Sequence, residues 1–143
     1  MISHSHKNSN MAFIIGIDPG TKTGFAAWNS KDKCLEVVKT CSIVEAMATL
    51  LATEGVCKVR IEDARQRKWF GKATDARLQG VGSVKRDCAV WQEFCEYYGL
   101  VYELVHPKNI NTKMKPAMFN KITGYEGKTS NHARDAAMMV YGL

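Results

Sequence analysis

The chain has 143 residues, enough for one domain that can bury a hydrophobic core without disulfides or a structural metal. Its 45% hydrophobic and 24% charged residues are ordinary for a globular protein. It contains no run of about 18 apolar residues and no charged-then-apolar leader, so we expect neither a membrane span nor a secretory signal. The net charge of +6 favours a polyanionic partner, although many small basic proteins bind no nucleic acid.

The cysteine pattern bears on the compartment. The five cysteines are an odd number and form no CxxC pair, which argues against a disulfide framework and against a zinc site. Most of them sit in apolar strand or helix patterns, where a thiol behaves as a small hydrophobic group. We therefore expect a protein of a reducing cytoplasm.

The first half of the chain predicts a strand meander. Residues 1–11 are polar and are expected to form a flexible N-terminal arm, which leaves 12–143 as one domain. Three strands are expected, separated by the turns at Pro19-Gly20 and Ser30–Lys33: Phe13–Asp18, Phe25–Asn29 and Cys34–Cys41. Such short connections favour antiparallel pairing of neighbours.

The second half alternates helices with strands. Ser42 and Glu45 form a capping box that starts a helix, and Gly55 is expected just after its end. The expected elements that follow are a strand over Val56–Asp63, a long helix from Ser83 to Gly99, a strand over Leu100–Val105, a basic segment over Lys108–Gly127 that Pro116 interrupts, and a last helix from Thr129 or Ser130. This order predicts an α/β fold in which helices flank a mixed five-stranded sheet.

Acidic side chains fall at positions where the predicted fold would bring them together. Asp18 and Glu62 each end a strand, and Asp135 follows His132 by three residues on one face of the last helix. Three carboxylates at one point repel one another unless a cation lies among them. Oxygen ligands favour Mg²⁺, for which Mn²⁺ commonly substitutes. Two such ions about 4 Å apart would activate water and stabilise the leaving oxygen of a phosphodiester.

These motifs resemble those of the RuvC-type Holliday junction resolvases, members of the ribonuclease H-like superfamily. The opening Ile15-Gly16-Ile17-Asp18-Pro19-Gly20 with Thr23-Gly24 is similar to their first strand, Ile61-Glu62 to their fourth-strand acid, and His132-Ala133-Arg134-Asp135-Ala136 to the motif of their last helix. Lys121-Ile122-Thr123-Gly124 is similar to the stretch before that helix. The resemblance covers nearly the whole chain from Phe13, and the short chain with its loose spacing looks most like phage-type members.

The resemblance implies a ribonuclease H-like fold and a Mg²⁺-dependent endonuclease that acts as a homodimer in a bacterial or phage-infected cell. Such an enzyme binds a four-way DNA junction and nicks two strands symmetrically. By this carry-over Asp18, Glu62 and Asp135 are catalytic metal ligands, with Asp18 bridging both ions. His132 stands where many members have a carboxylate, so it is expected to ligate metal or orient water, or else it is a surface or capping histidine. Asp63 is predicted to face away from this site.

A basic and aromatic segment follows the proposed ligand Glu62. Its expected DNA-binding residues are Arg65, Arg67, Lys68, Trp69, Phe70 and Lys72, where cations would hold phosphates and an aromatic ring would stack on an unpaired base. The alternative is a surface loop whose aromatics tuck into the core. Lys85 and Arg86, predicted near a helix start, are expected to add phosphate contacts.

Other readings of the same residues remain open. Asp-Pro-Gly-Thr also opens actin-like ATPases, but 143 residues leave no room for their second phosphate loop. A nuclease of this fold that cuts flaps, forks or RNA–DNA hybrids is the nearest alternative. A non-catalytic junction-binding protein is another, although such a protein gains nothing from clustered carboxylates beside phosphates.

Overall fold

The computed structural model describes residues 11–66, 75–109 and 113–143. Its strands are β1 (Phe13–Asp18), β2 (Thr23–Asn29), β3 (Cys34–Cys41), β4 (Val56–Glu62) and β5 (Tyr102–Val105). Its helices are α2 (Ile43–Ala52), α3 (Asp75–Tyr97), α4 (Pro116–Thr123) and α5 (Asn131–Met138), with 3-10 turns η1 (Ala64–Gln66) and η2 (Pro107–Asn109). None of the helices in these ranges has the length and apolar character needed to cross a membrane.

The strands form one mixed sheet in the order β3-β2-β1-β4-β5. β1, β2 and β3 pair antiparallel, as the predicted meander requires, and β4 and β5 continue the sheet parallel to β1 and β4. The prediction of an α/β fold with a mixed five-stranded sheet is therefore confirmed. The consequence for function is that β1 and β4 are parallel neighbours, so both end at the same edge of the sheet.

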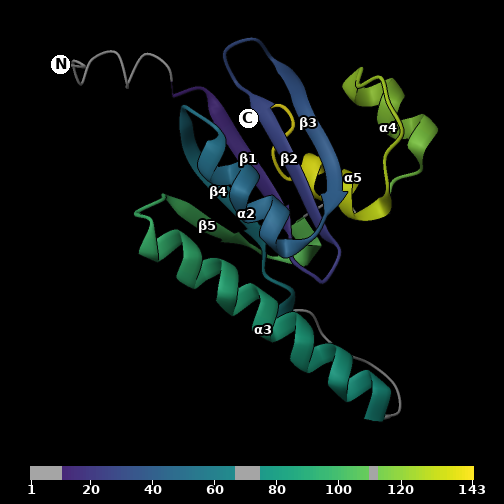
Figure 1. Cartoon of the computed structure of the whole chain (residues 1–143). Coiled ribbons are helices and arrows are strands. Elements are labelled where there is room, and N and C mark those ends of the chain that lie inside the picture. The colour runs from purple at the N-terminus through teal and green to yellow at the C-terminus, as the bar shows by residue number, and fades with distance from the viewer. Residues whose placement is uncertain (1–10, 67–74, 110–112) are drawn as a thin grey trace, which may run out of the picture.

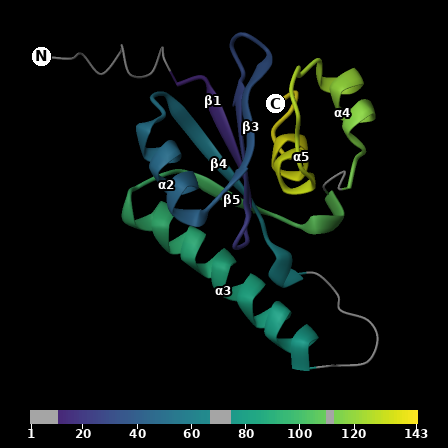
Figure 2. The same cartoon turned by 45° about the vertical axis from the view of Figure 1, so that its right-hand side comes forward.

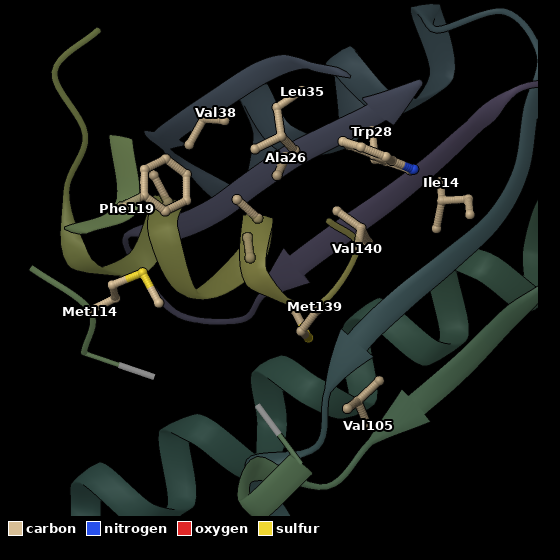
Figure 3. Close-up of a cluster of buried hydrophobic side chains, with 13 residues drawn as sticks. Ile14, Ala26, Trp28, Leu35, Val38, Val105, Met114, Phe119, Met139 and Val140 are labelled. Carbon is tan, nitrogen blue, oxygen red and sulfur yellow. The ribbon is translucent and has the colours of Figure 1, made fainter. Parts of the chain in front are cut away.

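Helices cover both faces of this sheet (Figures 1 and 2). α2 and α3 lie on one face, and α4 and α5 lie on the other. Alternate residues of β1 divide between the two layers: Ile15 and Ile17 join the cluster with Trp91 of α3, whereas Ile14 joins the cluster with Val140 and Phe119. Figure 3 shows the second cluster between the sheet and the last helix. The even-numbered positions of β1, including Asp18, thus face α5.

The start of the long helix corrects one prediction. α3 begins at Asp75, eight residues before Ser83, so Ser83 is an interior residue and not its cap. Gly80 and Gly82 disfavour a helix interior, because each glycine there costs about 1 kcal/mol relative to alanine. Once the second half of the helix is fixed by the fully buried Trp91, extension toward the N-terminus needs no new nucleation and tolerates that cost.

Smaller differences concern element ends. β2 begins at Thr23, β4 ends at Glu62, and α2 stops at Ala52 with Thr53 as its C-cap, so Gly55 falls in the following turn. Ser42 accepts the amide of Glu45 as expected, at 3.1 Å. Pro116 starts α4 at its first turn, where the missing N–H of proline costs nothing.

Candidate metal centre

The two strand-ending acids lie next to each other. Ile17 of β1 is in register with Ile61 of β4, so the following residues, Asp18 and Glu62, stand side by side at the sheet edge. Both acids are buried, with 7% and 3% of their surfaces exposed. Ionised carboxylates are strongly destabilised by such burial unless they are hydrogen-bonded or neutralised, so this placement needs compensating groups.

The last helix brings its polar residues to the same edge. Nδ1 of His132 lies 2.9 Å from Oδ2 of Asp18, which joins α5 directly to the end of β1. Two glycines make the approach possible, because a Cβ on Gly24 would lie 2.0 Å from the carbonyl oxygen of His132, and a Cβ on Gly16 would lie 2.1 Å from that of Ala136. At its other end, α5 is held by Arg60, which donates to the carbonyl of Met139 at 2.9 Å.

Burial and neighbouring charges shift the pKa values of two side chains at this edge, His132 and Asp135. The hydrogen bond to Asp18 raises the pKa of His132 against the opposing effect of burial, and the charges of Asp135 and Glu62 act in the same direction. Burial raises the pKa of Asp135, and the negative charge of Asp18 adds to it. The N–H of Lys113 opposes that shift by donating to Oδ1 of Asp135 at 3.0 Å. His132 and Asp135 therefore both respond to the charge of Asp18.

The donor set fits a hard divalent cation. Buried acids at one sheet edge, beside a desolvated third acid, form a site of excess negative potential that a cation would relieve. In the described parts of the chain, no three His, Cys, Asp or Glu side chains lie close enough to enclose an ion as they stand. Like charges without a cation between them separate, so some of the candidate ligand side chains would have to rotate if an ion bound.

A hollow opens beside the site. It has a volume of about 630 Å³ and is lined by Thr21, Lys22, Thr40, Cys41, Ser42, Ser130, Asn131 and His132. His132 therefore belongs both to the acidic site and to the wall of the hollow. Most of the exposed wall is apolar, and hydroxyl groups with the ammonium group of Lys22 supply its polar atoms.

The predicted DNA-binding residues are only partly placed. Arg67, Lys68, Trp69, Phe70 and Lys72 lie outside the described residues. Lys85 and Arg86 are exposed on α3, but they lie well inside the helix and not at its start, so the argument from a helix N-terminus was wrong for them. Their role in DNA contact stays a prediction.

Arg65 and Asp63 form a local structure of their own. Nε of Arg65 lies 2.7 Å from Oδ1 of Asp63, and its Nη2 donates to Gln92 of α3 at 3.3 Å. Asp63 pairs with Arg65, which in turn contacts α3, and this is consistent with the exclusion of Asp63 from the acidic site. These contacts attach the segment after β4 to α3, and DNA contact by Arg65 remains a prediction.

Two groups around the site were not singled out by sequence reasoning. One is the backbone N–H of Lys113, and the other is the buried side chain of Arg134, which is 5% exposed. A backbone amide cannot be recognised as a functional group from the sequence. Burial of Arg134 was weakly indicated, since it stands among alanines that face the core.

Comparison with known proteins agrees with this architecture. The structure is similar to that of T. thermophilus RuvC in complex with a Holliday junction substrate, with a TM-score of 0.57 over 87% of each chain at 15% sequence identity. No protein-family model matches the sequence, and no curated protein matches it. At this identity the likeness shows the fold alone: the chain is an α/β protein whose fold is similar to that of RuvC.

Proposed function

We propose that the protein is a divalent-metal-dependent endonuclease that resolves four-way DNA junctions. The observation that carries the proposal is the convergence of Asp18, Glu62 and α5 at one edge of a RuvC-like sheet. The structural neighbour was solved with a Holliday junction substrate, which supports branched DNA as the substrate class. The basic charge of the chain supports a nucleic-acid partner in the same way.

Asp18, Glu62 and Asp135 are the proposed ligands of Mg²⁺, which Mn²⁺ would replace. A divalent ion held there supplies Lewis-acid stabilisation of the phosphodiester and lowers the pKa of attacking water. Asp18 occupies the middle of the proposed ligand set, since it is the neighbour of Glu62 in the sheet and contacts His132 on α5. His132 is proposed either to ligate the metal through a neutral nitrogen or to hold the attacking water, with Asp18 fixing the ring orientation in the second case.

The hollow beside His132 is the proposed path of the DNA strand. Lys22 lines it and carries the positive charge that a phosphate would contact. Lys85 and Arg86 lie within one turn of Cys88 in α3, on its N-terminal side. The thiol of Cys88 donates to the carbonyl of Glu62 at 3.5 Å. The side chains of Lys85 and Arg86 are exposed, and we propose that they add phosphate contacts near the end of β4.

A homodimer is the proposed functional form, because symmetric nicking of a junction requires two active sites. Exposed hydrophobic side chains on α3 and just after it support a protein partner there: Val90 is 38%, Tyr97 82% and Tyr98 49% exposed. Sedimentation equilibrium tests this part of the proposal, and a monomer at micromolar concentration would contradict it.

A panel of labelled DNA substrates tests the proposed activity. Purified protein is incubated with a four-way junction, a fork, an RNA–DNA hybrid and linear duplex, each with Mg²⁺ and with a chelator. Paired symmetric nicks in the junction alone, only with Mg²⁺, are the expected result. Equal cutting of every branched substrate would leave a nuclease without junction selectivity, and binding without cutting would indicate the non-catalytic alternative.

A further inference from the structure

Arg134 is a buried cation held by backbone and side-chain oxygens. It is 5% exposed, and each of its guanidinium nitrogens donates a hydrogen bond. Nε donates to the carbonyl of Met114 at 2.7 Å, and Nη1 donates to the carbonyl of Thr129 at 2.5 Å and to its hydroxyl at 2.9 Å. Nη2 donates to Oδ1 of Asn131 at 2.5 Å. A guanidinium group satisfied in this way fixes the chain segments that supply the acceptors.

One of those segments also reaches the candidate metal centre. Met114 follows Lys113, whose N–H donates to Oδ1 of Asp135 at 3.0 Å. Arg134 and Asp135 are consecutive on α5, and so are the two residues that they contact in the segment before α4. The segment is thus attached to α5 at two successive positions, once through a carbonyl and once through an amide.

The backbone of this segment adopts a conformation that needs support. Lys113 has φ of 59°, in the left-handed region that side-chain-bearing residues rarely occupy. Such a conformation costs about 1–3 kcal/mol and persists only where surrounding contacts hold it. The bond from Arg134 to Met114 and the burial of Met114 in the core, with 8% exposed, supply those contacts.

We infer that Arg134 is a positioning residue for the metal ligand Asp135. It holds the 113–114 segment so that the Lys113 amide fixes Oδ1 and restrains rotation of the carboxylate. A carboxylate restrained in this way loses less conformational freedom when an ion binds, so it binds the ion more tightly. This inference rests on the proposed function, because it requires that Asp135 ligates a cation.

The conservative variant Arg134→Lys tests the inference in the free protein. Lysine keeps the charge but cannot span the three sets of acceptors with a planar fork. The Mn²⁺ dissociation constant is measured by electron paramagnetic resonance or calorimetry, without DNA. We expect Arg134→Lys to weaken Mn²⁺ binding by about 10–100-fold, the range typical of groups that orient metal ligands. In cleavage assays, the Mg²⁺ concentration for half-maximal rate should rise while the rate at saturating Mg²⁺ changes less.

A control variant separates positioning from general stability. Val38→Ala, in the same core cluster but away from the acids, should lower the melting temperature without changing Mn²⁺ affinity in the folded protein. If Arg134→Lys does not fold, Thr129→Val removes one hydroxyl acceptor and should produce a smaller weakening in the same direction.

The outcomes are distinguishable. Wild-type protein that binds no Mn²⁺ would overturn the metal site and with it the proposed function. Wild-type protein that binds Mn²⁺, with equal affinity in the folded Arg134→Lys or Thr129→Val variant, would overturn the positioning role alone. In NMR spectra, the Lys113 amide resonance should shift in Asp135→Asn and in the Arg134 variant, and an unchanged resonance in the latter would contradict the link through Met114.

Discussion

At the scale of single residues, the absence of a side chain at Gly24 determines how closely α5 approaches the sheet. A Cβ there would lie 2.0 Å from the backbone oxygen of His132 and 3.0 Å from Cβ of Asp18. Neither atom is the end of a flexible side chain, so the helix itself has to move. The same residue therefore links packing to the geometry of the acidic site.

Gly24→Ala should lower the free energy of unfolding by about 3 kcal/mol, at the upper end of the usual cost of overpacking. It should also abolish cleavage, because displacement of α5 separates His132 from Asp18. Urea denaturation measures the first effect. The matched control is Gly82→Ala, where a Cβ meets no described atom within 4 Å and the helix should gain about 0.5–1 kcal/mol. Equal stability of the two variants would contradict the close contact.

At the scale of elements, serine caps start the two helices that flank the hollow. Ser42 accepts the amide of Glu45 at the start of α2, and Ser130 accepts the amide of Ala133 at 3.4 Å at the start of α5. Replacing either serine with alanine should cost about 1 kcal/mol in unfolding free energy. α5 carries His132 and Asp135, whereas α2 carries no proposed ligand. The two serine replacements should therefore affect the metal site differently.

Ser130→Ala should weaken Mn²⁺ binding several-fold, because fraying of the first turn moves His132, whereas Ser42→Ala should leave the affinity unchanged. Hydrogen exchange should show faster opening of the first turn of α5 in Ser130→Ala alone. Equal Mn²⁺ affinity in both variants, at equal loss of stability, would show that the start of α5 does not control the site.

Much of this architecture could be predicted from the sequence, because its signals are local. The alternation of apolar residues predicted the strands, and the acids Asp18 and Glu62 at their ends indicated the edge of the sheet where the candidate site lies. The three-residue spacing of His132 and Asp135 indicated which face of α5 points to that edge. The start of α3 at Asp75 could not be predicted, since packing of the second half of the helix outweighs the cost of Gly80 and Gly82 in its first half. Nor could the role of Arg134, whose acceptors lie in segments that only the tertiary fold brings together.

At the scale of the whole molecule, the net charge of +6 should make DNA binding strongly dependent on salt. The double variant Lys85→Ala/Arg86→Ala should weaken junction binding and reduce the slope of log affinity against log salt by about one to two. Lys31→Ala/Lys33→Ala is the control, since these exposed lysines lie in the turn between β2 and β3, at the opposite end of the sheet from Asp18. Equal slopes for both double variants would remove α3 from the DNA-binding surface.

The central claim is that the acids at the end of β1 and β4 perform metal-dependent cleavage and do not merely accompany DNA binding. Asp18→Asn keeps the size of the side chain and removes its charge. With a labelled four-way junction in Mg²⁺, this variant should bind within about threefold of the wild type, since phosphate contacts dominate affinity, and should produce no nicks. Cleavage by Asp18→Asn at the wild-type rate would contradict the assignment of the site.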